Sequence, residues 1–338
     1  MGCKENQMNA LVTGGGGFIG SALVHELVKT GYNVTSFSRS DYPELREIGV
    51  AVKRGDLSDR EAVLNSCDGI DIVFHVAAKA GYWGSYKDYY ETNVRGTVNI
   101  INACREKKIK WLIFTSSASV IFGGTDIEGL DESLPYPSRP LSDYTATKAL
   151  AEQYVLKANC SSLRTLALRP HIVLGPGDKH IIPRVLAQAR EGKLLQIGDG
   201  NNKTDISYID NVVSAHLCSA KAIMNNPEVS GKAYFISNGE PVVIWEYINT
   251  ILKKAGLESI NKSVPVRAAF IYAALTELFH IIFIIRKEPR LTRFLVHELS
   301  QSHWFNINSA RKLLGYNPGI SNMEGLKKLI EALPKPGR

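Results

Sequence analysis

The sequence of 338 residues is long enough to bury a large core, and its length favours about two domains. Its composition, 44% hydrophobic and 22% charged, is that of an ordinary globular protein without low-complexity tracts or internal repeats. The net charge of +7 comes from scattered lysines and arginines, and no nucleic-acid-binding signature accompanies it. We therefore expect a solvated basic surface and no nucleic-acid partner, with affinity for anionic ligands or lipid head groups left open.

Cysteine usage and the N-terminus bear on the compartment. The five cysteines are odd in number and form no CxxC pair, which predicts free thiols in a reducing cytoplasm. The first residues contain no apolar signal region, and Asn6 stands where a myristoylation site has Ser or Thr. The sequence predicts a cytoplasmic protein, at most associated with a membrane surface.

A glycine-rich turn, Gly14–Gly20, lies between the first predicted strand, Asn9–Thr13, and a predicted helix. In such a turn Gly14 permits the tight bend and Gly17 lets the backbone approach a diphosphate. The diphosphate would meet the free N–H groups at the N-terminus of the helix. This context predicts a dinucleotide-binding site.

The second predicted strand, Asn33–Phe37, ends in Ser38 and Arg39. An NAD-selective site usually places a carboxylate here, whereas an arginine fork suits a 2′-phosphate. NADP(H) is therefore favoured and NAD(H) is the alternative; Arg39 could also merely stack on adenine or face water. After the third strand, Asp56 is a candidate acceptor for the adenine amino group, unless it or Ser58 caps a helix.

The fourth predicted strand, Asp71–Val76, ends in two alanines that let a cofactor lie against the backbone. The loop 79–84 either brings Tyr82 and Trp83 towards the cofactor or covers the core. Asn93 lies on the next predicted helix, which opens at Tyr89 and reaches about Lys107. It either holds backbone or water near the site or is a plain internal hydrogen-bonding residue. Further candidates for cofactor contact are Phe18, Ile19, Leu57, Ala77, Ala78, Lys79 and Thr115.

Ser117 follows the fifth predicted strand, Trp111–Thr115, at the sheet edge where ligands bind in open α/β folds. Tyr144 and Lys148 are four residues apart on the next predicted helix and so project from one face. An ammonium there would lower the pKa of Tyr144 and make it a candidate general acid or base. A YxxxK pattern alone also arises by chance, so its weight comes from the preceding motifs.

The sixth predicted strand, Arg164–Leu168, leads to Pro170 and His171. Pro170 fixes the chain beside the expected nicotinamide. His171 has no evident partner in the sequence, so we interpret it as a histidine of the pocket wall or the core. The segment Gly123–Arg139, rich in Pro, Gly and acids, is expected to be a loop.

Six strand–helix alternations predict an α/β fold with a Rossmann-type doubly wound parallel sheet and a smaller, mainly helical C-terminal substrate lobe. The predicted division assigns 8–178 and 205–238 to an NAD(P)-binding domain, and 179–204 and 239–335 to the substrate lobe.

One predicted helix of that lobe, 267–286, contains the almost wholly apolar run Ala268–Ile285, close to the roughly 20 residues that span a bilayer. Thr276, Glu277 and His280 fall on one side of it, and a carboxylate in mid-membrane costs about 3 kcal/mol. We therefore expect this helix to line a hydrophobic substrate pocket or to touch a membrane surface. Core or dimer packing and a membrane span are the alternatives.

Several motifs together resemble those of the extended short-chain dehydrogenases/reductases. They are Thr13–Gly20, Ser117, Tyr144 with Lys148, and Arg169-Pro170. Within that superfamily the chain is similar to the 3β-hydroxysteroid dehydrogenase branch. Segments resembling sterol-4α-carboxylate 3-dehydrogenases are 116–122 and 168–171. Segments resembling the bacterial 2-alkyl-3-oxoalkanoate reductases of long-chain olefin synthesis are 79–84, 291–294, 303–304 and 314–316; at Ser117 that group often carries Thr before Pro.

The resemblance implies hydride exchange between a nicotinamide and a carbinol or carbonyl carbon. Tyr144 would transfer the proton, Ser117 would hydrogen-bond the oxygen, and Lys148 would hold the ribose hydroxyls. A 3-oxo acid or a sterol-like substrate is implied, with Lys79 or Arg184 as candidates for a carboxylate, together with a homodimer and no metal.

Two other functions remain open. A nucleotide-sugar epimerase or reductase shares the N-terminal machinery, but the lobe is apolar, and Ala118 follows Ser117 where sugar dehydratases have a carboxylate pair. A non-catalytic NADP(H)-binding sensor is disfavoured because Ser117, Tyr144 and Lys148 are all present.

Overall fold

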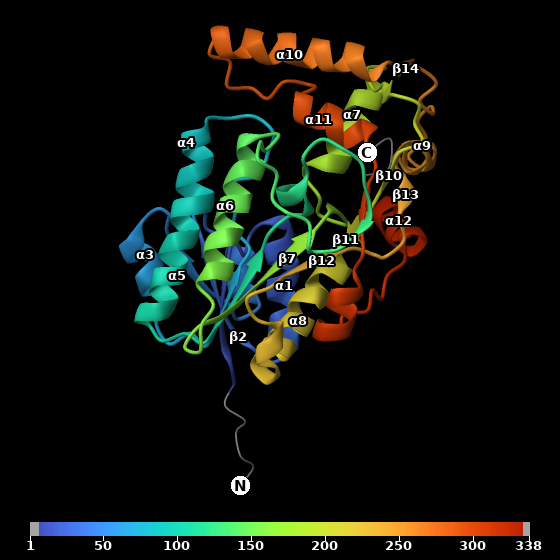
Figure 1. The fold of residues 1–338 in the computed structure, drawn as a ribbon. Helices are drawn as coiled ribbons and strands as arrows, with labels where there is room; N and C mark the ends of the chain where they lie inside the picture. Colours follow the sequence, from blue (N-terminus) through green and yellow to red (C-terminus); the bar gives the residue numbers. More distant parts are fainter. Residues whose placement is uncertain (1–6, 334–338) are drawn as a thin grey trace.

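The computed structural model describes residues 7–333, so the expectation at Asn6 lies outside the described residues. A parallel sheet forms its centre (Figure 1). It has seven strands in the order β12-β7-β5-β4-β1-β2-β3. The strands are β1 (Asn9–Thr13), β2 (Asn33–Ser38), β3 (Ala51–Arg54), β4 (Ile72–His75), β5 (Trp111–Thr115), β7 (Arg164–Pro170) and β12 (Ala233–Ile236). Most are continuous apolar runs, as expected for strands covered on both faces. The predicted Rossmann-type fold is confirmed.

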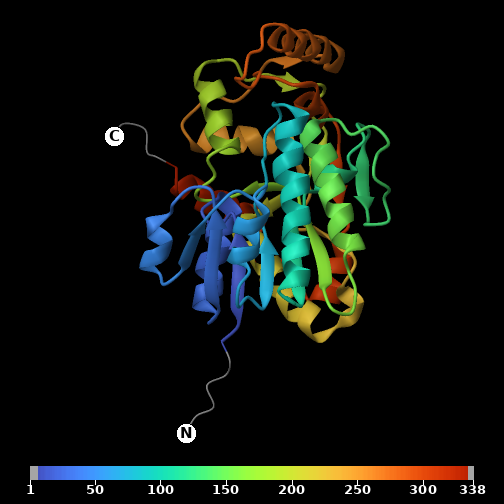
Figure 2. The same cartoon turned by 90° about the vertical axis from the view of Figure 1, so that its left-hand side faces the viewer.

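Helices cover both faces of this sheet, and each face buries its own apolar cluster. One face carries α1 (Phe18–Lys29) and α8 (Ile209–Asn225), and the other carries α3 (Arg60–Ser66), α5 (Gly96–Glu106) and α6 (Asp143–Lys157). Figure 2 shows α5 and α6 side by side in front of the strands. Short elements in the first half of the chain are α2 (Pro43–Glu47), α4 (Tyr86–Tyr89), η1 (Tyr90–Arg95) and η2 (Ala118–Ile121).

The helix that carries Asn93 begins earlier than the sequence indicates. The Ser85 hydroxyl caps it by accepting a hydrogen bond from the Asp88 N–H at 3.2 Å. Between α4 and α5 the backbone of η1 winds as a π-helix. Such wide turns are frequent at functional sites, and this one places Asn93 beside the end of β4.

The second lobe is built mainly from helices around its own apolar cluster, which includes Trp245 and Ile251. Its helices are α7 (Ile181–Arg190), α9 (Ile244–Lys254), α10 (Val266–Ile282), α11 (Arg293–Ser300) and α12 (Asn322–Glu331). Short paired strands complete it: β8 (Ile172–Leu174) with β11 (Ile206–Tyr208), β9 (Gln196–Ile197) with β14 (Ser263–Val264), and β10 (Lys203–Thr204) with β13 (Val242–Val243) and β15 (His303–Phe305). Residues 305–316 lie instead against the core of the large sheet, where the Tyr316 hydroxyl donates to the Ser237 carbonyl at 2.8 Å.

The segment Gly123–Arg139 is not entirely a loop as predicted. It contains β6 (Ile127–Leu130), which pairs in parallel with β15. Because the partner strand lies far away in the sequence, no local pattern predicts this pairing.

Helix α10 is shorter than the predicted 267–286 and lies across the outer edge of the second lobe (Figures 1 and 2). It ends because Ile284 adopts a left-handed conformation, with φ of +52°. Within residues 7–333, no helix has the length and apolar character needed to cross a membrane.

Candidate active site

The glycine turn forms a cradle between β1 and α1. Gly14 has φ of +71°, and a Cβ there would lie 2.9 Å from the Cα of Ala77. Gly17 precedes the first helical residue, and no side chain among residues 7–333 caps α1. The N–H groups of Phe18 and Ile19 therefore have no side-chain acceptor, which is the arrangement that receives a diphosphate. The residues predicted here fit a dinucleotide.

A shallow groove lies at the C-terminal ends of β2 and β3, lined by Arg39, Arg54, Gly55 and Asp56. The hydroxyl oxygen of Ser38, at the end of β2, is buried and has no hydrogen-bond partner in the described part of the chain. Arg54 is a second cation that sequence reasoning missed, although it directly precedes Gly55-Asp56. A polar, cationic groove at this place fits the adenosine ribose of a dinucleotide.

Asp56 points a carboxylate at this groove but caps no helix. It accepts from the N–H and the hydroxyl of Ser58, at 2.9 and 2.8 Å, and these hydrogen bonds and the charge of Arg39 lower its pKa. The N-cap of α3 is Asp59, so the predicted cap at Asp56 or Ser58 is wrong. Leu57 is buried against Gly96.

A chain of buried hydrogen bonds fixes the ends of β1 and β4. The Thr97 hydroxyl donates to the Asn93 carbonyl at 2.6 Å, so it accepts from Nε2 of His75 at 2.9 Å. Nδ1 of His75 then accepts from the Thr13 hydroxyl at 2.8 Å, and that hydroxyl accepts from the Ala77 N–H at 3.1 Å. Burial lowers the pKa of His75 to about 3, so the ring is neutral.

Asn93 holds the backbone beside the site, which is one of the two roles considered for it. Its side-chain oxygen accepts from the Lys79 N–H at 2.7 Å, and its amide donates to the Lys79 carbonyl at 3.1 Å. The amide also reaches the Thr147 hydroxyl on α6, at 3.2 Å. Ala77 and Ala78 thus lie between two fixed points, and Ala78 remains exposed at this edge.

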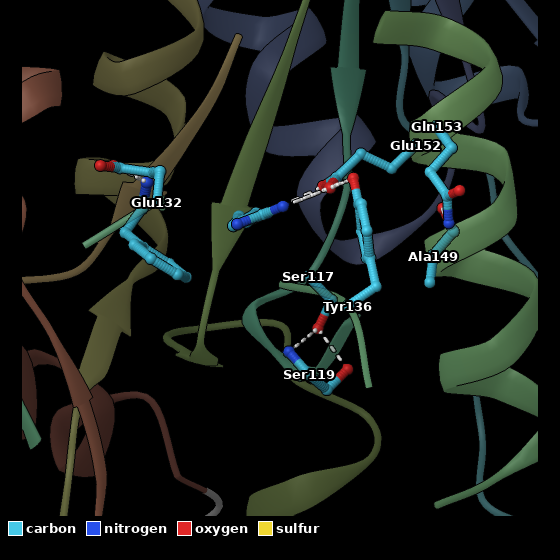
Figure 3. A network of polar contacts seen from close by, with 9 residues as sticks. Ser117, Ser119, Glu132, Tyr136, Ala149, Glu152 and Gln153 are labelled. Carbon is cyan, nitrogen blue, oxygen red and sulfur yellow. Dashed lines mark hydrogen bonds and ion pairs between the residues drawn. The ribbon is translucent and has the colours of Figure 1, made fainter. Parts of the chain in front are cut away.

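Ser117 and Tyr144 meet at the C-terminal edge of the sheet. Ser117 caps η2 directly after β5, and its hydroxyl oxygen is 2.8 Å from that of Ser119, which sequence reasoning did not single out (Figure 3). Tyr144 lies in the first turn of α6, where a capping box begins the helix at Ser142. Burial raises the pKa of Tyr144, the Ser117 hydroxyl lowers it, and Glu298 raises it.

The sequence predicts that Lys148 lowers the pKa of Tyr144, and this prediction is wrong. Its ammonium is directed to β5, where it donates to the Thr115 carbonyl at 2.7 Å and lies 4.0 Å from the centre of the Phe114 ring. Burial lowers the pKa of Lys148 to about 7, and the charge of Glu152 opposes this shift. The Thr115 hydroxyl donates to Nε2 of His216 at 2.7 Å, because Nδ1 of that ring donates to the Val212 carbonyl.

A buried ion pair that sequence reasoning missed involves Glu152, which lies one turn beyond Lys148 on α6. Glu152 accepts from Nη2 of Arg169 at 2.6 Å and from the Tyr136 hydroxyl at 2.6 Å (Figure 3). Both charged side chains are almost completely buried. Tyr144, Lys148 and Glu152 are spaced four residues apart. This spacing is the sequence signal that could have placed Glu152 on the same helix face as Tyr144 and Lys148.

His171 is a packed histidine, as interpreted from the sequence, and it follows the buried Pro170 at the end of β7. Its Nε2 lies 2.6 Å from Nδ1 of His303, and burial lowers the pKa of His171. Nε2 of His303 donates to the Glu298 carbonyl at 2.7 Å, so its Nδ1 accepts from His171. The two rings and the Glu298 carboxylate bring their donor atoms within 4.8 Å of one another, but both facing ring nitrogens already bond each other.

A cavity of about 1000 Å³ opens beside Tyr144, between loop 79–85, the start of α6 and the inner side of α10. Tyr82 stacks on Phe294 at 5.2 Å, and the Trp83 indole donates to the Ile285 carbonyl at 3.1 Å. Thus both loop aromatics contact the lobe around the cavity, and the C-terminal part of 267–286, from Glu277 onwards, lines it.

Three cations line this cavity. Lys79 pairs with Asp88 at 3.1 Å, Arg293 pairs with Glu277 at 2.6 Å, and Arg286 makes no ion pair with any residue from 7 to 333. Arg184, the other predicted partner for a carboxylate, is not part of the wall. It binds Glu288 and the carbonyls of residues 289 and 290.

Comparison with known proteins identifies the class. The chain matches the 3-beta hydroxysteroid dehydrogenase/isomerase family over residues 11–266. It is 46% identical over 324 residues to the 2-alkyl-3-oxoalkanoate reductase of Stenotrophomonas maltophilia (strain K279a), covering 95% of this chain and 98% of that protein. It is 33% identical over 326 residues to the decarboxylating sterol-4-alpha-carboxylate 3-dehydrogenase of Mus musculus, covering 95% and 90%.

Among solved structures, MoeE5 in complex with UDP-glucose and NAD is similar with a TM-score of 0.74 at 26% identity, covering 96% of this chain and 98% of that one. These matches confirm the resemblance to extended short-chain dehydrogenases/reductases. The chain is therefore a nicotinamide-dependent dehydrogenase or reductase that acts on hydroxyl and keto groups. It belongs to the 3-beta hydroxysteroid dehydrogenase/isomerase family.

Proposed function

We propose that this protein interconverts the 3-oxo and 3-hydroxy groups of a hydrophobic acid of the 2-alkyl-3-oxoalkanoate type, with NADP(H). The observation that carries the proposal is the cavity, which has Tyr144 on one wall and Ile281 and Ile284 on another. A carbonyl held at Tyr144 would extend its alkyl chain along α10. The similarity to a 2-alkyl-3-oxoalkanoate reductase supports this substrate class.

Tyr144 is the proposed proton donor in the direction of reduction. A bound NADPH would supply the hydride to the carbonyl carbon and become NADP⁺. Tyr144 would give its phenolic proton to the carbonyl oxygen, and solvent would reprotonate the phenolate. Because burial raises the pKa of Tyr144, the phenol is protonated near neutral pH, which suits a donor.

Ser117 and Lys148 would support that transfer. The Ser117 hydroxyl adjoins the phenol and would hydrogen-bond the same substrate oxygen. Lys148 lies one turn along α6 from Tyr144, and its ammonium would hold the ribose hydroxyls.

The preference for NADP(H) rests on the groove at the ends of β2 and β3. Arg39 and Arg54 both line it, so two guanidinium groups are available to a 2′-phosphate. For the substrate carboxylate, Lys79 and Arg286 are the proposed partners because both line the cavity.

A nucleotide-sugar substrate is the second candidate, favoured by the similarity to MoeE5, whose structure holds UDP-glucose. A sugar diphosphate needs many polar contacts to its hydroxyls. Trp83, Ile281, Ile284 and Phe294 form an apolar part of the cavity wall, and polar and charged side chains line the rest. The apolar part favours an acyl chain.

The test is NADPH oxidation with 3-oxo acids of increasing chain length, 3-oxosteroids and UDP-sugars. Wild type, Tyr144→Phe and the exposed control Tyr86→Phe would be compared. We expect turnover of long-chain 3-oxo acids, reduced by about 10²- to 10⁴-fold in Tyr144→Phe and unchanged in Tyr86→Phe. Turnover of UDP-sugars alone, or a fully active Tyr144→Phe, would overturn the proposal.

A further inference from the structure

Helix α10 presents its apolar side to solvent. One stripe on it has successive spacings of four, three and four residues, which place its members on a single helical face. The stripe consists of Ile271, Leu275, Leu278 and Ile282, each more than half exposed. The buried side of the helix carries Ala269, Ala273 and Glu277 instead. An ordinary surface helix has the reverse arrangement, with its large apolar side chains turned inwards.

The C-terminal end of α10 adds a second unusual feature at Ile284. The Ile284 N–H donates to the Ile281 carbonyl at 3.2 Å, and the Ile285 N–H donates to the His280 carbonyl at 2.8 Å, as in a Schellman cap. Glycine or asparagine normally occupies the left-handed position of this cap, because a β-branched residue is strained there. Ile284 nevertheless adopts φ of +52° and is 83% exposed.

This cap is unfavourable in water on two counts, since it strains the backbone and exposes an isoleucine. Phe283 beside it is also 61% exposed. Strain of this kind persists where function requires it. The position therefore indicates an apolar environment for the end of α10.

Positive charge flanks the apolar stripe at both ends. The segment 267–293 contains five cations and two acids. Both acids are paired, Glu277 with Arg293 and Glu288 with Arg184. Arg267 before the stripe and Lys287 after it form no ion pair within the described residues, 7–333. An apolar helix face between exposed cations is complementary to a lipid surface that carries negative head groups.

We propose that α10 docks on an anionic lipid bilayer, with its apolar stripe at the boundary between head groups and acyl chains. Figures 1 and 2 both show α10 at the outermost edge of the lobe, with no other element beyond it. Ile281 and Ile284 are exposed on this edge and also line the cavity. If the proposed function holds, the cavity therefore opens at the layer in which a long-chain substrate dissolves.

Vesicle flotation tests the docking without any need for turnover. Vesicles of phosphatidylcholine containing phosphatidylglycerol are compared with vesicles of phosphatidylcholine alone. We expect wild type to float with the anionic vesicles and to be released by added salt. Arg267→Gln with Lys287→Gln should weaken binding about 25-fold, at about fivefold for each cation removed.

Apolar variants provide the second arm. Leu275→Ser with Ile282→Ser should weaken binding by about tenfold or more, whereas Met323→Ser, an exposed apolar residue elsewhere, should leave it unchanged. Ile284→Gly should weaken binding and also raise the midpoint of thermal unfolding, because it relieves the strain at φ of +52°. A merely structural role for Ile284 would not give both effects.

The proposal is overturned if wild type does not float with anionic vesicles or if these variants float equally well. It is also overturned if Leu275→Ser with Ile282→Ser converts a dimer into a monomer in sedimentation velocity, because a second copy then covers the stripe. NADPH oxidation with a short, water-soluble 3-oxo acid is measured on the Arg267/Lys287 and Leu275/Ile282 double variants, because none of these four residues lines the cavity. Loss of flotation with that activity intact separates failed docking from failure of the proposed function.

Discussion

Lys148 and Glu152 lie one turn apart on the same face of α6, and both side chains are almost completely buried. Burial lowers the pKa of Lys148 to about 7, while the negative charge of Glu152 raises it. The same carboxylate binds Arg169 at 2.6 Å. The protonation of the lysine beside Tyr144 therefore depends on a carboxylate that a second cation shares.

Removing the charge of Glu152 tests this dependence. Glu152→Gln should lower the pKa of Lys148 further, because the only opposing influence named above is lost. The loss of activity that accompanies deprotonation of Lys148 should then move to lower pH in a profile of kcat/KM. The variant should also be less stable to denaturant by about 3–5 kcal/mol, because Arg169 is left buried without its partner.

Tyr136→Phe is the matched control for that experiment. It removes the hydrogen bond to Glu152 but keeps the carboxylate charge. Its pH profile should coincide with that of wild type, and Glu152→Asp should also leave the profile near its original position. A profile in Glu152→Gln that coincides with wild type would show that Glu152 does not influence Lys148.

Ser117 and Ser119 form a second matched pair, since their hydroxyl oxygens are 2.8 Å apart. Ser117→Ala should reduce kcat by about 10²- to 10³-fold, because a donor to the substrate oxygen is lost. Ser119→Ala removes only a neighbour of that donor and should cost less than about tenfold in kcat. Equal losses in the two variants would mean that Ser119 is itself a donor to the substrate.

The groove containing Arg39 predicts a selective effect on the cofactor. Arg39→Ala should raise the KM for NADPH by about 10- to 100-fold, the value of a charge-assisted hydrogen bond, and change the KM for NADH little. Arg54→Ala should act in the same direction, because Arg54 lines the same groove. If either variant weakened both cofactors equally, the preference for NADP(H) would be contradicted.

Buried neutral histidines predict how stability depends on pH. The pKa of His75 is lowered to about 3 in the folded state, against about 6.5 in an unfolded chain. Between these values the unfolded state binds a proton that the folded state excludes. The free energy of unfolding should therefore be constant above about pH 6.5 and fall as the pH decreases towards about 3. His216, with a pKa of about 4, acts in the same direction.

Denaturant titrations across this acidic range would measure the slope. His75→Gln should reduce it, whereas the exposed substitution His25→Gln should not. A slope that survives in His75→Gln would assign the acid sensitivity to other groups, such as the carboxylates of the buried ion pairs.

The parts of the fold that were predictable are those determined by local spacing. Strand and helix alternation identified the sheet, and the glycine turn identified its first crossover. Ser117 and Tyr144 were correctly placed together, because one ends a strand and the other begins the next helix along a parallel sheet edge. Such relationships can be predicted because they depend only on elements that follow one another in the sequence.

The missed parts depend on contacts between distant segments. His171 was judged to lack a partner, yet His303 lies 2.6 Å away through a strand pairing in the second lobe. The pKa of Tyr144 was misjudged because spacing on a helix does not reveal that Lys148 turns towards the Thr115 carbonyl. The length of α10 was overestimated because apolar periodicity continues through Ile284, where the backbone turns left-handed.

The hydrogen bonds that join Asn93, Thr97, His75 and Thr13 allow a single arrangement of hydrogen atoms. Each hydroxyl has one acceptor for its proton, and the ring has one donor nitrogen and one acceptor nitrogen. The two ends of this chain are the Ala77 N–H and the Asn93 carbonyl, which are peptide groups that neither release nor take up a proton near neutral pH. These side chains therefore brace the backbone at Ala77 and do not relay protons.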